Sequence, residues 1–287
     1  MIISYYSKKG GVGTSTLATY NAHYLAKKGM KVLYISLCEQ ASVYSLLGYY
    51  SITTDKDSRH LELLLEEFNK TTNDLDRNNL IRQYMRTIRD NVDVIHVKNI
   101  LEVGSLVILE DNYEVNLSNL IEYLDGIYDY VIVDYPIIIN DAVIEFLNRS
   151  SVIIYVSGIS ALEEHSLLNF TQVLVNNDYN FRDNIFVLPN SWDLKDDLKL
   201  NNINKLKQDI LSYSQLYDNV TILNPLEIFE KLYDLQQIGV SIYDDNVYNV
   251  FSDDIQELKN IIYSFNNVYK KVDIFANSYL ELRKLID

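Results

Sequence analysis

The chain has 287 residues, of which 48% are hydrophobic and 23% are charged, as in an ordinary globular protein. Its 25 Lys and Arg residues stand against 40 Asp and Glu residues, so the formal net charge is -15 at pH 7. That charge opposes any binding mode that neutralises many phosphates, and it disfavours a DNA-coating role.

The single cysteine, Cys38, cannot close a disulfide within the chain. The first residues, MIISYY, run into a strand-like segment without the basic stretch and long apolar core of a signal peptide. No window approaches the roughly 20 unbroken apolar residues of a membrane-spanning helix. We therefore expect a soluble protein of the reducing cytoplasm, and contact with the inner membrane surface or a cell pole stays open.

Short β-branched and aromatic runs alternate with longer segments of helical period, and several of the runs are apolar on both faces. The expected strands are Ile2–Tyr6, Lys31–Ser36, Val92–Val97, Tyr128–Asp134, Val152–Ser157, Ile185–Leu188 and Val220–Leu223. The expected helices are Ser15–Lys28, His60–Asn69, Asn79–Arg89, Leu117–Asp125, Asp141–Asn148, Leu162–Asn176 and Leu226–Ile238. This alternation predicts an α/β fold with a doubly wound, mostly parallel sheet flanked by helices, which binds ligands at the carboxyl ends of its strands.

Three segments fit the alternation less well. Residues 49–92 are interpreted as an excursion at the sheet edge, and residues 190–218 as a long surface connection with one helix. We expect a domain over residues 1–252 and a helical extension over 253–287. The apolar stripe of the extension comprises Ile255, Leu258, Ile262, Phe265, Tyr269, Val272, Ala276 and Tyr279. The stripe predicts packing on the domain, with a dimer or partner contact as the alternative and Asn266–Asn267 as the expected break point if the helix divides.

The most informative residues follow the first expected strand, where residues 7–16 read SKKGGVGTST and lead into a helix. A strand, a glycine-rich turn and a helix N-terminus can cradle phosphate, because free backbone N–H groups and the helix dipole both favour an anion there. The strict pattern G-x-x-x-x-G-K-[ST] fails twice, since Lys8 stands at the first glycine and Thr14 at the lysine. A glycine turn that only lets the helix pack closely is the alternative.

Residues 9–13, KGGVG, resemble the deviant Walker A loop of the MinD/ParA superfamily, whose pattern is K-G-G-x-G-K-[ST]. Residues 31–40 are similar to the second strand and first switch of that superfamily. Residues 128–136 are similar to its Walker B strand, and residues 187–190 to its strand ending in a base-reading asparagine. Within the superfamily, GGVGTST resembles the TadZ/CpaE branch of Tad-type pilus assembly, although this chain lacks the receiver-like domain that such members often carry.

The resemblance implies ATP and Mg²⁺ as cofactors. The implied nucleotide-binding residues are Lys9, Gly10, Gly11, Val12, Gly13, Thr14, Ser15, Thr16 and Asn190. Ser15 and Asp134 stand at the Mg²⁺ positions, and Lys9 matches the signature lysine that reaches across a nucleotide-sandwiched dimer. Ordinary alternatives remain for three of them: a turn cap for Asp134, a solvated side chain for Lys9 and a turn residue for Asn190.

The first switch departs from the family pattern D-x-D-P-Q, because Ser36 and Cys38 replace its two aspartates. Phosphoryl transfer depends on positioning and on neutralising developing charge, so these losses and Thr14 remove contributions on which hydrolysis relies. Glu39 is displaced by one residue and points elsewhere on an extended backbone. We expect nucleotide binding with slow or absent hydrolysis, and no catalytic residue is identified.

Other candidate sites are weaker. The four histidines, His23, His60, His96 and His165, lack a second ligand at metal spacing. The 24 tyrosines lack the basic stripe that nucleic-acid binding requires. Arg82, Arg86 and Arg89 would share one face of the expected helix and are the best candidate for a local anionic contact, although a solvated helix is the simpler interpretation.

These observations favour a MinD/ParA-like ATP-binding protein that forms a nucleotide-dependent homodimer. Its expected role is localisation or assembly of a Tad-type pilus or related polar machinery, with protein partners and without nucleic acid. One alternative is a ParA-type partition ATPase for plasmid or chromosome cargo. Another is a scaffold that has lost the nucleotide.

Overall fold

The computed structural model describes residues 1–48, 59–101, 103, 113–158, 161–177, 179, 184–190, 220–223, 225–227, 229, 231–251 and 255–286. Of the surface connection expected at 190–218, all but Asn190 therefore lies outside the described residues.

Within the described residues, eight strands form one sheet in the order β3-β4-β2-β5-β1-β6-β7-β8. Their bounds are β1 Ile2–Tyr6, β2 Val32–Ser36, β3 Arg86–Arg89, β4 Val92–His96, β5 Tyr130–Asp134, β6 Val152–Ser157, β7 Ile185–Pro189 and β8 Val220–Ile222. All neighbours pair in parallel except β3, which runs antiparallel to β4 at the edge. The predicted doubly wound, mostly parallel sheet is confirmed.

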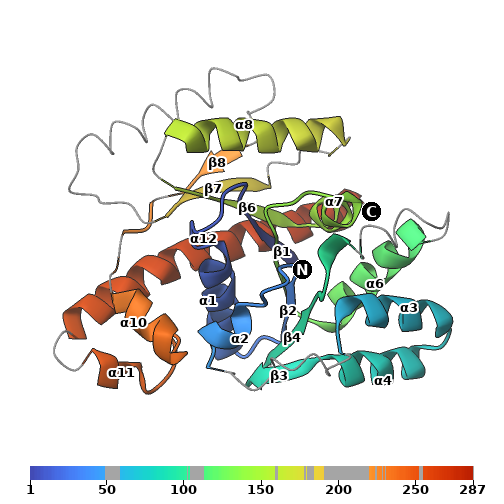
Figure 1. Ribbon diagram of the computed structural model, residues 1–287, viewed down its shortest axis with the longest axis horizontal. Helices are drawn as coiled ribbons and strands as arrows, with labels where there is room; N and C mark the ends of the chain where they lie inside the picture. The colour runs from blue at the N-terminus through green and yellow to red at the C-terminus, as the bar shows by residue number, and fades with distance from the viewer. Residues whose placement is uncertain are drawn as a thin grey trace.

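The described helices are α1 Thr14–Lys27, α2 Val43–Leu46, α3 Leu61–Lys70, α4 Asp74–Tyr84, α6 Tyr113–Ile127, α7 Asp141–Asn148, α8 Ala161–Asn176, α10 Lys231–Ile238, α11 Val247–Val250 and α12 Ile255–Ile286. Helix α1 lies on one side of the central strands, and α3, α4 and α6 lie on the other (Figure 1). Because successive side chains of a strand point to opposite faces, Ile3 and Tyr5 join the core cluster under α1 and α12, whereas Ile2 and Tyr6 join the cluster under α3, α6 and α7. Both faces of the sheet are therefore covered, as the apolar strands predict.

Helix α12 packs along the domain and runs unbroken through Asn266 and Asn267, so the helix does not divide there. Its buried side chains are Leu258, Ile261, Phe265, Val268, Tyr269, Val272 and Ala276, all members of the α1-side core cluster. Burying one large apolar side chain contributes roughly 1.5 to 3 kcal/mol, so this face adds to the common core. Asn266 is accommodated because its Oδ1 accepts a hydrogen bond from the Tyr243 hydroxyl at 2.9 Å.

The helix expected at Asn79–Arg89 is wrong in its second half. Helix α4 ends at Tyr84, Met85 adopts an extended conformation with φ -74° and ψ 146°, and β3 follows. In β3 the side chains of Arg86 and Ile88 are buried and Thr87 is exposed, which is the alternation of a strand. The three arginines therefore do not share a helix face.

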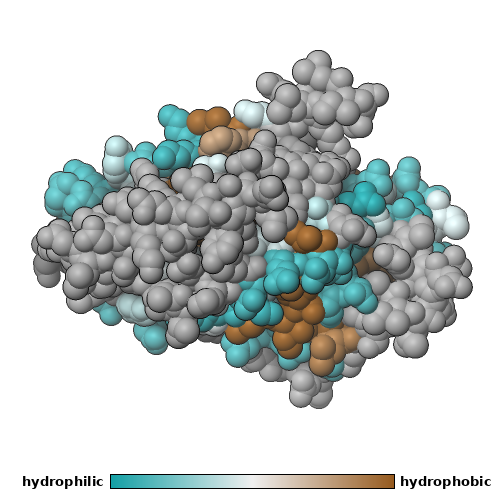
Figure 2. All heavy atoms as spheres, turned by 90° about the horizontal axis from the view of Figure 1, so that it is seen from above, coloured by the Kyte–Doolittle hydropathy of each residue, from teal (hydrophilic) through white to brown (hydrophobic). Residues whose placement is uncertain are grey.

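Two smaller differences concern helix ends and short helices. Helix α10 begins at Lys231 rather than at Leu226, and the single-turn helices α2 and α11 were not expected. Among the described residues, no helix combines the length and the apolar content needed to cross a membrane. The face of the molecule in Figure 2 carries hydrophobic residues in small groups bordered by hydrophilic ones.

Candidate functional site

The turn between β1 and α1 has the geometry of an anion cradle. Gly11 and Gly13 adopt positive φ angles of 79° and 92°, which residues with a Cβ atom rarely adopt. Gly13 is also the N-cap of α1, and no side chain caps the helix there. The first N–H groups of α1 have no partner within the helix, and the helix dipole makes this end positive. A negatively charged group would be stabilised at this turn.

A cavity of about 780 Å³ opens over this turn. Its walls include eight predicted site residues: Lys9, Gly10, Gly11, Gly13, Thr14, Ser15, Thr16 and Asn190. The ninth nucleotide-binding candidate, Val12, is buried and packs into the core, so it supports the turn from below. The structure thus brings together most of the residues that the sequence grouped.

Asp134 lies at the carboxyl end of β5 and is fully buried. Burial raises the pKa of this carboxyl from 3.8 to about 6, and nearby Ser15, Tyr34 and Cys38 lower it only in part. Neither carboxylate oxygen makes a hydrogen bond of ordinary geometry within the described part of the chain. A buried carboxylate that lacks hydrogen bonds of ordinary geometry costs free energy, which a cation or a bound water would offset.

The donor set fits a hard divalent cation that keeps most of its water. Asp134 and Ser15 supply oxygen atoms, which Mg²⁺ prefers, while no group of three or more His, Cys, Asp or Glu side chains at metal distance occurs in the described segments. Mg²⁺ usually binds through one or two protein oxygens together with waters and substrate phosphates. The residues present match that mode rather than an all-protein cage.

The segment after β2 lacks carboxylates at the two switch positions. Ser36 is buried, and its hydroxyl donates a hydrogen bond to the Cys38 carbonyl oxygen at 3.2 Å. Burial, followed by the nearby Asp134 charge, raises the pKa of the Cys38 thiol far above its usual range, so the thiol stays protonated. Glu39 is exposed on the cavity wall. The described residues of this segment offer no buried base that would orient an attacking water.

Charge on the cavity wall is sparse. Lys9 is the only cationic side chain among the described wall residues, and Glu39 and Glu227 are the acidic ones. Lys9 itself is exposed. Backbone dipoles and a bound cation, rather than a cluster of ammonium groups, would therefore have to balance a polyphosphate.

The side chain of Asn190 lies against the glycine turn. Its amide Nδ2 donates a hydrogen bond to the carbonyl oxygen of Val12 at 2.7 Å. The amide therefore contacts the glycine turn itself. This contact joins residues 178 positions apart, and sequence spacing carries no signal for it.

Sequence reasoning also missed the wall formed by α10 and the residues before it. Phe229, Leu232, Tyr233 and Gln236 line the cavity, and Gln236 Nε2 donates a hydrogen bond to Thr16 Oγ1 at 3.1 Å. Helical period predicted a helix here, but not its position over the start of α1.

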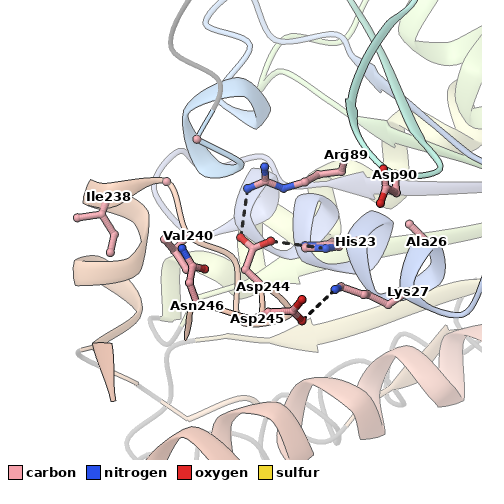
Figure 3. A pocket seen from close by; sticks show the side chains of 12 residues that line it. His23, Ala26, Lys27, Arg89, Asp90, Ile238, Val240, Asp244, Asp245 and Asn246 are labelled. Atoms are coloured by element: carbon pink, nitrogen blue, oxygen red, sulfur yellow. Dashed lines mark hydrogen bonds and ion pairs between the residues drawn. The ribbon is translucent and has the colours of Figure 1, made fainter. Parts of the chain in front are cut away.

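A second cavity of about 520 Å³ lies at the other end of α1 (Figure 3). Arg89 Nη2 pairs with Asp244 Oδ2 at 3.2 Å, and Lys27 Nζ pairs with Asp245 Oδ1 at 3.4 Å. Burial lowers the pKa of His23 from 6.5 to about 4, so its 3.9 Å contact with Asp244 is not an ion pair at neutral pH. The charges of this cavity largely satisfy one another.

Comparison with known proteins identifies a family and a fold. A family model described as AAA domain (AAA_31) matches residues 1–187. A ParA family ATPase from Chlorobium tepidum TLS has a similar structure, with a TM-score of 0.66 and 17% identity over 93% of this chain and 98% of that one.

Two further structures are similar at comparable levels. A plasmid partition protein from Borrelia burgdorferi B31 bound to AMPPNP has a TM-score of 0.62 and 18% identity over 91% of this chain and 98% of that one. The Aquifex aeolicus MinC:MinD cell division complex has a TM-score of 0.61 and 17% identity over 91% and 95%. No curated protein matches the chain.

Proposed function

Because this chain belongs to the AAA_31 family of AAA domains and has the fold of ParA and MinD ATPases, we propose that it binds ATP together with Mg²⁺. The observation that carries the proposal is the buried Asp134 carboxylate, which makes no hydrogen bond of ordinary geometry among the described residues and is only partly stabilised by nearby Ser15, Tyr34 and Cys38. It lies beside Ser15 in the first turn of α1. Orphaned carboxylate oxygens next to an uncapped helix N-terminus suit a cation and the anion that it accompanies.

The phosphates would rest on main-chain N–H groups of Gly11, Gly13, Thr14 and Ser15, whose backbone forms the cavity floor. The Ser15 hydroxyl would bind Mg²⁺ directly, and Asp134 would hold one of its waters. Bound Mg²⁺ neutralises phosphate charge that the lost lysine would otherwise share. The exposed Lys9 would reach the phosphates of a second copy.

The same features favour binding over hydrolysis. Thr14 provides no ammonium group, Ser36 is committed to a hydrogen bond with Cys38, and the Cys38 thiol is held neutral. Positioning of the attacking water and stabilisation of developing charge are both weakened. The protein would act as a switch set by the presence of the γ-phosphate, with slow or absent turnover.

The switch would control a homodimer that localises or assembles a larger machine. Ile137 and Ile138 are about half exposed beside the glycine turn, with exposed fractions of 47% and 51%, and both line the cavity. A second copy would cover this rim together with Lys9. The small residue Thr14 in place of the lysine favours a Tad-type pilus or related polar assembly at the inner membrane surface, by resemblance to the TadZ/CpaE branch.

A second candidate is partition of plasmid or chromosome cargo. Its support is the structural similarity to a Borrelia burgdorferi plasmid partition protein. The net charge of -15 opposes the non-specific DNA binding on which such a role depends. An ATP-dependent, salt-sensitive shift of duplex DNA would favour this candidate over pilus assembly.

Calorimetric titration with ATP tests the proposal when it is run with Mg²⁺ and with EDTA. We expect Asp134→Asn to weaken ATP binding about tenfold or more with Mg²⁺, as loss of a group that orients metal ligands does, and to leave binding in EDTA unchanged. Asp244→Asn, at the far end of α1, is the matched control and should bind like the wild type. Sizing of the same samples by light scattering reports the dimer.

Failure to bind ATP at millimolar concentration would overturn the proposal and favour a nucleotide-free scaffold. Turnover typical of a ParA ATPase, abolished in Asp134→Asn, would overturn the expectation of slow hydrolysis.

A further inference from the structure

We propose that Asn190 is a positioning residue for the glycine turn, whose side-chain amide orients the phosphate-binding main chain. The inference rests on the proposed phosphate site and names how this chain holds that site in shape. It differs from the base-reading role that the sequence suggests for Asn190, and the experiment below separates the two roles.

The backbone of Asn190 is fixed independently of its side chain. Its N–H donates to the Ser157 carbonyl oxygen of β6 at 2.9 Å, which continues the parallel pairing of β7 with β6. The preceding Pro189 accepts a hydrogen bond from the Leu226 N–H at 2.9 Å. The side chain thus projects from a rigid strand end and can impose its geometry on a neighbour.

That neighbour is the peptide group between Val12 and Gly13. Asn190 Nδ2 lies 2.7 Å from the Val12 carbonyl oxygen. Only the nitrogen end of the amide can face a carbonyl oxygen favourably, which fixes the orientation of the amide. In a planar trans peptide the C=O and N–H bonds point in opposite directions. Holding the Val12 carbonyl toward Asn190 therefore turns the Gly13 N–H away from Asn190 and fixes the direction of one proposed phosphate donor.

The backbone conformation of residue 13 favours glycine, and the Asn190 amide lies close to it. Its φ angle of 92° already disfavours a side chain. In addition, a Cβ atom at this position would lie far inside van der Waals distance of Asn190 Nδ2. A side chain at residue 13 would therefore strain the turn through its φ angle and would also push the Asn190 amide away from its present position.

The test compares ATP, GTP and inorganic tripolyphosphate, each with Mg²⁺, in calorimetric titrations of the wild type and Asn190→Ala. A positioning residue acts on the phosphate cradle, so all three ligands should bind about two- to tenfold more weakly, as loss of one hydrogen bond predicts. The ratio of ATP to GTP affinity should not change. Asn190→Ser, whose side chain is too short to reach Val12, should lose the same affinity as Asn190→Ala. Agreement between the two variants excludes misfolding of one of them as the cause.

Base reading predicts a different pattern, in which tripolyphosphate binding stays at the wild-type value and the ATP to GTP ratio shifts. That result would overturn the inference. Asn249→Ala, on the exposed face of α11, is the matched control and should leave the affinity for all three ligands unchanged.

Hydrogen–deuterium exchange of the ligand-free proteins separates this inference from the proposed function. We expect faster exchange in residues 10–16 of Asn190→Ala and unchanged exchange elsewhere in α1. If the wild type ignores all three ligands, the proposed function fails, and exchange alone decides the role of Asn190. Identical exchange in the two proteins would overturn that role.

Discussion

Helix α1 begins at one cavity and ends at another. Its 14 residues span about 21 Å. The two cavities differ in how their charged side chains are paired. Near the first, Asp134 is fully buried beside the wall residues Ser15 and Cys38, and neither of its oxygens makes a hydrogen bond of ordinary geometry among the described residues. At the second, Asp244 Oδ2 accepts hydrogen bonds from Arg89 at 3.2 Å and from the Ser241 N–H at 2.8 Å.

The far cavity is not fully satisfied either. His23 Nδ1 and Arg89 Nε have no hydrogen-bond partner within the described part of the chain. Neither atom leaves a charge unpaired, because His23 is neutral and Arg89 pairs through Nη2. A buried carboxylate without a cationic partner, more than cavity size, therefore distinguishes the end of α1 that is suited to a charged ligand.

The largest test of this comparison is Asp134→Asn in the ligand-free protein. Because the folded pKa of about 6 exceeds 3.8, Asp134 favours the folded state most below pH 3.8, and this contribution falls as pH rises to about 6. Asparagine cannot ionise, so the variant should be more stable than the wild type near pH 8, by at most about 3 kcal/mol. Urea denaturation at pH 8 and pH 4.5 measures the gain, which should shrink at the lower pH. A variant that is less stable than the wild type at both pH values would contradict the raised pKa of Asp134.

The second test is His23→Gln, which concerns the opposite end of α1. The folded pKa of about 4 lies below 6.5, so stability from a neutral His23 is fully present above pH 6.5 and is lost as pH falls toward 4. The wild type should lose about 2 kcal/mol from this group between pH 7 and pH 5, and the variant should not. Because Asp134 and His23 act in opposite directions in one pH range, denaturation curves of both variants are needed. Equal pH slopes in the wild type and His23→Gln would contradict the buried neutral state.

The third test breaks the paired charge of the far cavity. Arg89→Gln leaves the partly buried Asp244 with only the Ser241 N–H as a strong donor, and it should cost about 1 kcal/mol of stability. ATP affinity should not change, since the residue lies at the other end of α1. Arg82→Gln on exposed α4 is the matched control, and denaturation midpoints of both should be compared. A loss of ATP affinity in Arg89→Gln would show that the two cavities are coupled.

The fold was largely predictable because its signals are local. Seven strands of the described sheet carry apolar or aromatic runs at nearly the expected bounds, and the glycine turn marks the start of α1. Strand β3 was not predicted because Arg86, like most arginines, was expected at the surface, whereas it is buried in the strand. Arg86 is buried only through tertiary contacts, with Nη1 donating to the Tyr44 hydroxyl at 3.1 Å and to the Arg59 carbonyl at 3.0 Å.

The sequence predicted which residues form most of the site, but not the contacts that their side chains make. The glycine turn and Asp134 follow from short motifs that place them at strand ends. The partners of Asn190 and Gln236 depend on how β7 and α10 lie over α1, and residues separated by 178 and 220 positions share no local pattern. Likewise, no local pattern indicates that the Tyr243 hydroxyl donates a hydrogen bond to Asn266 Oδ1 within α12.

The smallest expected effect belongs to Lys27→Gln, and its smallness is informative. The Lys27–Asp245 pair spans 3.4 Å, but Lys27 is about half exposed and Asp245 fully so, with side-chain exposures of 47% and 101%. Water and salt screen such a pair, and ordering two long side chains offsets most of its attraction. The denaturation midpoint should therefore stay within experimental error at both low and high salt. A clear, salt-sensitive loss would mean that this rim is less solvated than its exposure implies, and the far cavity would then depend on long-range charge as well as on the Arg89–Asp244 contact.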